Sequence, residues 1–229
     1  MKIKGIQKTT LLDYPGKVAC TIFTESCNFR CPFCHNASLV IKSNEEPCIS
    51  EEEIFSFLKK RTGILDGVCI TGGEPLLQHD IIPFLQAIRA MGYSIKLDTN
   101  GAFPEKLKQI VEMKLIDFIA MNIKNTREKY ALTAGTAQTP EKVFESIKFI
   151  MECGIAYEFR TTVVRELHTK DDILEIAKNI SGAEKYALQC FKDSGDLICN
   201  GYSAHSEQTM REMLELIVPF VKKAELRGV

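Results

Sequence analysis

Three cysteines stand close together near the N-terminus, in a C-x3-C-x2-C spacing at Cys27, Cys31 and Cys34. Their thiolates can converge on one metal centre only if the chain wraps around it. Three thiolates suit three irons of a cubane cluster, whereas clusters used purely for electron transfer usually have four cysteine ligands. The missing fourth ligand leaves one iron open to a small molecule. The alternative is a Cys3His zinc site that uses His35, which is chemically reasonable.

Short motifs with polar groups and glycines end the next three predicted strands. Gly72, Gly73 and Glu74 close one strand, where paired glycines let the backbone approach a ligand closely. Asp98 ends the following strand, and Lys124 follows the one after that. Turn chemistry at Asp98 and a solvated side chain at Lys124 are the structural alternatives. If these groups share a site, that site contains both a carboxylate and an amine.

A strand followed by a helix recurs six times and must position these groups. Apolar strands that alternate with amphipathic helices predict a parallel sheet with helices on its outer face. Six units are too few for a closed eight-stranded barrel, so we predict an α/β fold with a partial (β/α)6 barrel. A doubly wound sheet is the competing fold, and in both folds the active site lies at the C-terminal ends of the strands. The predicted strands span 17–25, 67–71, 94–99, 117–123, 156–164 and 185–189, and the predicted helices span 50–61, 79–91, 104–113, 140–152, 171–180 and 206–227.

The length of the chain bears on its number of domains, and its net charge bears on its partners. At 229 residues the chain is long enough for one well-filled core. We predict a single domain over residues 1–229, in which about residues 1–16 are an N-terminal extension. Lys and Arg number 29 against 30 Asp and Glu, so no whole-protein basic field favours nucleic acid or anionic lipid as a partner.

The sequence also bears on the compartment. No apolar run is long enough for a signal peptide or a membrane span, so we predict a cytoplasmic protein with no membrane partner and no nucleic-acid partner. Nine cysteines in a reducing compartment are expected to be metal ligands, catalytic thiols or buried residues rather than disulfides.

The cysteine spacing, with the aromatic Phe33 directly before the last cysteine, resembles the signature of the radical S-adenosylmethionine (SAM) superfamily. The Gly-Gly-Glu motif follows one strand–helix unit later, as it does in that superfamily. The resemblance implies two cofactors, a [4Fe–4S] cluster and SAM. It further implies that the open iron binds the methionine part of SAM, and that an electron from the cluster cleaves SAM to methionine and a 5′-deoxyadenosyl radical.

The resemblance also implies roles for residues around SAM. Backbone next to the last cysteine would meet the adenine, and the glycine motif with its carboxylate would receive the methionine amino group. A carboxylate and an amine at consecutive strand ends suit the ammonium and carboxylate groups of the same methionine. The residues implied at SAM are therefore Phe33, Gly72, Gly73, Glu74, Asp98 and Lys124.

Further motifs narrow the resemblance to the activating enzymes of glycyl-radical proteins. Those enzymes typically show Asp-x-Lys at the fourth strand, and the aspartate helps to bind a monovalent cation. This chain has Asn122 in place of the aspartate, which keeps an oxygen ligand but loses a charge. The stretch 124–135 looks most like the activating proteins of anaerobic ribonucleoside-triphosphate reductase.

The same resemblance implies a substrate side to the site. Asp13 lies in an element similar to the D-x-P-G motif of activating enzymes, and His35 and Asn36 follow the last cysteine as in many of them. These three residues would border the glycyl loop of the partner. Arg160 shares one face of its strand with Glu158 because side chains alternate along a strand. Arg160 would therefore point into the barrel lumen, and an internal salt bridge between the two is the alternative.

Three functions compete on this basis. The leading hypothesis, implied by the resemblance, is an enzyme that abstracts hydrogen from a glycine of a glycyl-radical enzyme, in particular anaerobic ribonucleoside-triphosphate reductase. Its electron donor would be a protein such as flavodoxin or ferredoxin. The second hypothesis is a radical SAM enzyme that acts on a small molecule. The third is a zinc-binding interaction domain.

Overall fold

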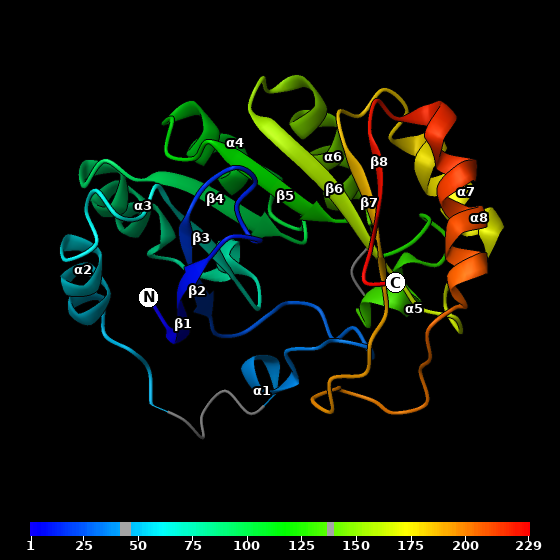
Figure 1. The fold of residues 1–229 in the computed structure, drawn as a ribbon, viewed down its shortest axis with the longest axis horizontal. Helices are drawn as coiled ribbons and strands as arrows, with labels where there is room; N and C mark the ends of the chain where they lie inside the picture. Colours follow the sequence, from blue (N-terminus) through cyan, green and yellow to red (C-terminus); the bar gives the residue numbers. More distant parts are fainter. Residues whose placement is uncertain (42–46, 137–139) are drawn as a thin grey trace.

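The computed structural model describes residues 1–41, 47–136 and 140–229. Eight strands form one curved sheet in the order of the sequence (Figure 1). β1 (Ile3–Thr10) runs antiparallel to β2 (Ala19–Thr24), and every later strand is parallel to its neighbour. The later strands are β3 (Gly67–Gly72), β4 (Ser94–Thr99), β5 (Phe118–Asn122), β6 (Ala156–Val163), β7 (Tyr186–Cys190) and β8 (Ala224–Arg227). The sheet does not close, because β1 and β8 stand at its two ends.

Helices connect the parallel strands, and the longer ones lie along the outside of the curved sheet (Figure 1). They are α1 (Ala37–Val40), α2 (Glu51–Lys59), α3 (Ile81–Ala90), α4 (Pro104–Glu112), α5 (Tyr130–Ala134), α6 (Glu141–Glu152), α7 (Lys170–Asn179) and α8 (Glu207–Ile217), with 3₁₀ turns at Pro75–Leu77 and Val218–Phe220. The short helices α1 and α5 lie at the C-terminal ends of the strands (Figure 1). The predicted start of α2 is confirmed. The Ser50 side chain accepts from the Glu53 N–H, and the Glu53 carboxylate accepts from the Ser50 N–H, so this capping box satisfies two backbone donors.

The two faces of the sheet differ in polarity, and this difference decides the fold class. On β4, Ile95 and Leu97 are fully buried in the core shared with the helices. Lys96 and Asp98 alternate with them and therefore face the inside of the curve. A doubly wound sheet has helices and apolar side chains on both faces. The structure thus confirms the partial barrel, with six strand–helix units followed by β8.

The ends of the chain depart from the prediction. Residues predicted as an N-terminal extension contribute β1, which pairs with β2. The predicted helix 206–227 is wrong in its second half, because the helix ends at Ile217 and Ala224–Arg227 form β8. Pro219 lies in the turn that follows the helix, where its ring is compatible with a helix end but not with further helix. Arg227 then ties β8 to β6 through Glu158, a contact that no local pattern indicates.

None of the helices in the described ranges is long and apolar enough to cross a membrane.

Candidate active site

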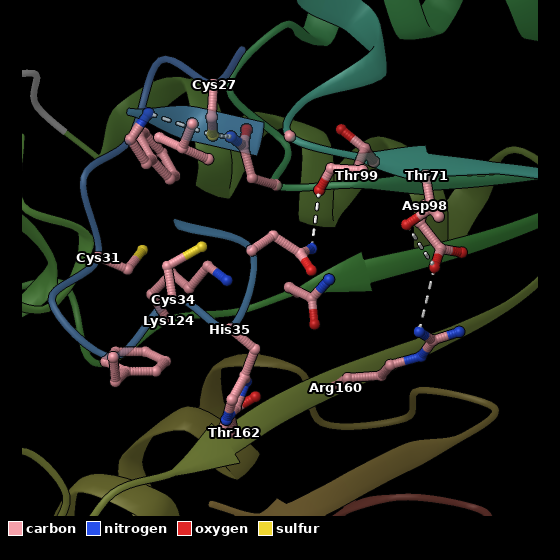
Figure 2. A pocket seen from close by; sticks show the side chains of 18 residues that line it. Cys27, Cys31, Cys34, His35, Thr71, Asp98, Thr99, Lys124, Arg160 and Thr162 are labelled. Carbon is pink, nitrogen blue, oxygen red and sulfur yellow. Dashed lines mark hydrogen bonds and ion pairs between the residues drawn. The ribbon is translucent and has the colours of Figure 1, made fainter. Parts of the chain in front are cut away.

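A cavity of about 230 Å³ lies at the C-terminal ends of the strands. It contains most of the residues that the sequence predicted for the site, which come from four strands and one loop (Figure 2). The predicted residues that line it are Cys27, Cys31, Phe33, Cys34, His35, Asn36, Gly72, Gly73, Asp98, Asn122, Lys124 and Arg160. Its other lining residues are Phe29, Val40, Thr71, Thr99, Asn100 and Thr162, which motif reasoning missed. Two predicted residues, Glu74 and Asp13, are outside the lining.

The three cysteines lie on the loop of residues 25–36, here called the cysteine loop. The Arg30 N–H donates to the Ala134 carbonyl at 2.9 Å, which fastens the loop to α5. Gly135 makes this contact possible, because a Cβ at this position would lie 2.1 Å from the Arg30 carbonyl oxygen. Gly135 also has a φ of +59°, which favours glycine at this helix end. The short helix α5 therefore supports the cysteine loop from outside the cavity.

The thiols themselves suit a metal cluster. Burial raises the pKa of Cys27 to about 12 and also raises the pKa of Cys31, although the positive charge of Lys124 acts in the opposite direction on both. Such thiols are protonated at neutral pH, and they become thiolate ligands when a bound cation compensates their charge. In Figure 2 the sulfur atoms of Cys31 and Cys34 point into the same space. No group of three His, Cys, Asp or Glu among the described residues could hold a single metal ion, but all three cysteines line the same cavity. The donor set therefore fits a multi-iron cluster, which spans more space than one ion and is loaded with release of protons.

His35 is held by the long loop between β7 and α8. Its Nε2 lies 2.6 Å from the Lys192 carbonyl, and its ring stacks on Phe191 with centroids 5.3 Å apart. The same loop brings Asp196 to the N–H and hydroxyl of Ser38, at 3.1 and 2.8 Å. His35 thus links the cysteine loop to this neighbouring loop, and one of its two ring nitrogens is already engaged.

The two glycines of the Gly-Gly-Glu motif allow backbone segments to pack against each other. A Cβ on Gly73 would lie 1.9 Å from the Ser26 carbonyl oxygen, and a Cβ on Gly72 would lie 2.3 Å from the Thr24 nitrogen. The Gly72 carbonyl accepts from the Asn36 side chain at 3.2 Å. Both glycines line the cavity, but the space behind Gly72 is filled by the end of β2 and the space behind Gly73 by the start of the cysteine loop.

Glu74 is fully buried, and its carboxylate holds the end of the next strand. It accepts from the Leu76 N–H at 3.0 Å, the Thr99 hydroxyl at 2.8 Å and the Asn100 N–H at 2.7 Å. Burial raises the pKa of Glu74 to about 7, although the three hydrogen bonds act to lower it. The prediction placed this carboxylate at SAM, whereas the structure places it behind the cavity wall, where it joins the ends of β3 and β4.

Asp98 lies on the far side of the cavity from the cysteines (Figure 2). It pairs with Lys96, with the Arg160 Nη1 at 3.3 Å and with the Thr71 hydroxyl at 3.3 Å. Burial alone would raise the pKa of Asp98, but the charges of Arg160 and Lys96 hold it below the ordinary value. The carboxylate is therefore ionised and already satisfied by two cations.

Arg160 lines the cavity, as predicted, and it also makes the internal salt bridge to Glu158 that was the alternative prediction. Its Nε lies 2.6 Å from Glu158, whose side chain is 1% exposed. Glu158 in turn binds both terminal nitrogens of Arg227 and the ammonium of Lys185. Burial would raise the pKa of Glu158, but its two arginine partners lower it well below the usual range. A chain of ion pairs thus crosses the lumen from β4 to β8 beneath the cavity.

Lys124 differs from the other charged groups because its side chain makes no ion pair with the residues that the structure describes. Its carbonyl lies 2.7 Å from the Nε2 of the buried His168, whose Nδ1 accepts from the Val164 N–H. Burial lowers the pKa of His168, so its neutral ring donates through Nε2. His168 fixes the backbone of Lys124, and no motif indicated this role.

Asp13 lies away from the cavity. It belongs to the hairpin that precedes β2, and its carboxylate accepts from the Thr21 hydroxyl at 2.6 Å. The cysteine loop follows the opposite end of β2. The resemblance implied that Asp13 lies beside His35 and Asn36. The structure does not bring Asp13 together with these two residues.

Comparison with known proteins identifies the family. The model of the radical SAM superfamily matches residues 21–187. A Methanocaldococcus jannaschii protein, provisionally named a glycyl-radical enzyme activating enzyme, is 30% identical over 99% of this chain and 96% of its own. The GTP 3′,8-cyclase of Helicobacter pylori is 26% identical over 68% of this chain, and the match spans 50% of that enzyme.

Solved structures agree on the fold. The Streptococcus suis protein SuiB, bound to its precursor peptide SuiA, superposes with a TM-score of 0.69 at 15% identity, over 87% of this chain and 46% of that one. A domain of the pyruvate-formate lyase-activating enzyme from Bacteroides vulgatus gives a TM-score of 0.59 at 18% identity, over 71% of this chain and 99% of the domain.

Proposed function

Because this chain belongs to the radical SAM superfamily, whose members use a [4Fe–4S] cluster and SAM, we propose that it activates a glycyl-radical enzyme. The cofactors supply a 5′-deoxyadenosyl radical when one electron enters the cluster and the C–S bond of SAM breaks, with methionine as the other product. The hydrogen abstracted would be the α-hydrogen of one glycine of the partner. The products are 5′-deoxyadenosine and a glycyl radical on the partner.

The observation that carries this proposal is the similarity to the Methanocaldococcus jannaschii protein, which extends over nearly the full length of both chains. The cyclase similarity spans only half of the cyclase. A match from end to end favours a shared overall design.

Different residues of the cavity are proposed to bind the iron–sulfur cluster and SAM. Cys27, Cys31 and Cys34 would bind three irons, and backbone at Phe33 would meet the adenine. Lys124 would bind the carboxylate of SAM, because it is the charged group of the cavity without an ion-pair partner among the described residues. The remaining contacts with SAM are proposed for Gly72, Gly73, Glu74 and Asp98, with Glu74 acting through the chain that it holds.

The substrate side of the site is proposed to include Asn36, His35 and Arg160, all of which line the cavity. Asn36 is bonded to the Gly72 carbonyl, so a loop that entered here would meet a side chain fixed to the cavity wall. Asp13 could meet a partner only at another point of contact, since it lies near the opposite end of β2.

The finer parts of the proposal rest on the sequence. The partner is anaerobic ribonucleoside-triphosphate reductase, as the stretch 124–135 indicates. The electron donor is a flavodoxin or a ferredoxin, the location is the cytoplasm, and residues 1–229 act as one domain without nucleic acid or membrane.

The test uses anaerobically reconstituted protein with SAM and a chemical reductant. Without a partner, formation of 5′-deoxyadenosine should be slow, because the radical reacts productively only with a C–H bond held in contact. Addition of the glycyl-radical enzyme should accelerate it and give a doublet electron paramagnetic resonance signal on that enzyme. A partner with its target glycine replaced by alanine should give no signal.

A matched pair of variants tests the substrate side. Asn36→Ala should impair activation of the partner more than it weakens SAM binding. Asn179→Ala, the same change at an exposed position on α7, should alter neither. Transfer of deuterium from a labelled small metabolite into 5′-deoxyadenosine, with every candidate glycyl protein left without a radical, would refute the proposal in favour of a small-molecule substrate.

A further inference from the structure

Cys27 differs from the other two cysteines in the hydrogen bonds that reach its sulfur. The Phe29 N–H donates to the Cys27 Sγ at 3.4 Å, and the Asn100 Nδ2 lies 3.7 Å from the same atom. Each of these two thiols also faces an acceptor, the Asn28 Oδ1 at 4.0 Å from the Cys27 Sγ and the Ala134 carbonyl at 3.7 Å from the Cys31 Sγ. Cys27 is therefore the thiol to which the chain presents two N–H donors.

The orientation of the Asn100 amide follows from its other contacts. Its Oδ1 accepts from the Ala102 N–H at 2.9 Å, and its backbone N–H donates to Glu74 at 2.7 Å. Because the oxygen is engaged by a backbone donor, the NH2 group must be the end that points to Cys27 and to the Asn28 Oδ1, 2.8 Å away. Glu74 thus acts on Cys27 through Asn100.

Asn28 fixes the position of the Asn100 amide. Its Oδ1 accepts from the Asn100 Nδ2 at 2.8 Å and lies 4.0 Å from the Cys27 Sγ, so the oxygen end of Asn28 faces this corner of the site. Its Nδ2 is buried and has no hydrogen-bond partner among the described residues.

We propose that Asn100 is a positioning residue for the cluster, which donates a hydrogen bond to sulfur at the Cys27 corner and raises the reduction potential of the cluster. Hydrogen bonds to cluster sulfurs are among the factors that set this potential. The reduced cluster carries one more negative charge than the oxidised cluster, so N–H donors stabilise it more. The inference rests on the three cysteine ligands and is independent of the identity of the partner.

The test is a redox titration of the anaerobically reconstituted protein without SAM, followed by electron paramagnetic resonance. Asn100→Ser removes the amide donor and keeps the backbone N–H that binds Glu74. It should lower the equilibrium constant for cluster reduction at least threefold, which is a shift of about 28 mV to lower potential at 59 mV per tenfold. Asn179→Ser on the exposed surface of α7 is the matched control and should leave the potential at the wild-type value.

A measurement on the wild-type protein covers the case in which Asn100→Ser fails to assemble the cluster. Labelling all asparagines with nitrogen-15 should change the nitrogen modulation in pulsed spectra of the reduced cluster, since an amide that donates to a cluster sulfur is magnetically coupled to it. An unchanged potential in Asn100→Ser at wild-type iron content would overturn the inference. So would spectra in which asparagine labelling changes nothing. If the partner enzyme formed no glycyl radical, the proposed function would fail, but neither the reduction potential nor the labelled spectra would change.

Discussion

The contact between Gly73 and the start of the cysteine loop leads to a sharp prediction for Gly73→Ala. The added Cβ would lie 1.9 Å from the Ser26 carbonyl oxygen and 2.5 Å from its carbon. Both are backbone atoms, so no side-chain rotation relieves the clash. The two segments must separate by roughly 1 Å, which is enough to break a hydrogen bond. Two bonds span this contact, from the Glu74 N–H to the Ser26 carbonyl at 2.8 Å and from the Gly73 N–H to the Thr24 carbonyl at 2.9 Å.

Each bond contributes about 0.5–1.5 kcal/mol, so Gly73→Ala should lower the free energy of unfolding by about 1–3 kcal/mol. Denaturant titration of the metal-free protein measures this change. Iron content after anaerobic reconstitution should fall as well, because Cys27 follows Ser26 directly. Gly5→Ala is the control, since among the described residues its Cβ would meet only the Phe23 side chain, at 3.7 and 3.9 Å. Wild-type stability and iron content in Gly73→Ala would refute the reasoning.

Three further predictions follow from the charged groups. Lys124→Ala should weaken SAM binding by about 1.5–3 kcal/mol, the cost of a lost charge-assisted hydrogen bond. Calorimetry on the reconstituted protein measures this affinity, and an unchanged affinity would contradict the prediction. Arg227→Met should lower the free energy of unfolding by a similar amount, about 1.5–3 kcal/mol, because Glu158 loses a bidentate partner; unchanged denaturant midpoints would argue against it. The folded-state pKa of Glu158 lies below its unfolded value, so its contribution is present above about pH 4.5 and is lost as the pH falls further. The stability difference between wild type and Glu158→Gln should therefore shrink between pH 7 and pH 3.5, and a constant difference would contradict the assigned ion pairs.

The central units of the fold could be predicted because each carries its own local signal. The strand 94–99 is confirmed at both ends, and α2 begins at its predicted cap. β1 and β8, the edge strands of the sheet, were missed. β1 pairs with the next strand along the chain, whereas the partner of β8 is distant in sequence. β8 is four residues long and is tied to β6 by the ion pair of Arg227 and Glu158, which only the folded chain brings together.

In the site, too, residues with a local sequence signal could be predicted and residues placed by distant contacts could not. Spacing alone identified the three cysteines, because metal ligands must be close together and the loop that carries them is short. Asn100 went unnoticed because Asp-Thr-Asn-Gly is also good turn chemistry. Glu74 was assigned to SAM because the Gly-Gly-Glu motif resembles that of the radical SAM superfamily. Its burial and its three donors, which place it behind the cavity wall, depend on β4 and could not be read from β3.

The electrostatics of the cavity favour one orientation for a zwitterionic amino acid. On one side, Lys124 lies near the cysteines without an ion-pair partner among the residues described, and a carboxylate would neutralise its positive charge. On the other side, the Asp98 carboxylate is already paired with Lys96 and Arg160. An ammonium brought to Asp98 would be the third cation around one carboxylate, and it would gain less there than at an unpaired acid. Backbone carbonyls at the end of β3, such as that of Gly72, accept hydrogen bonds without this repulsion. The affinity for the amino acid part of SAM should therefore depend more on Lys124 and the glycine backbone than on Asp98, whose main contribution is to hold β4 and β6 together below the cavity.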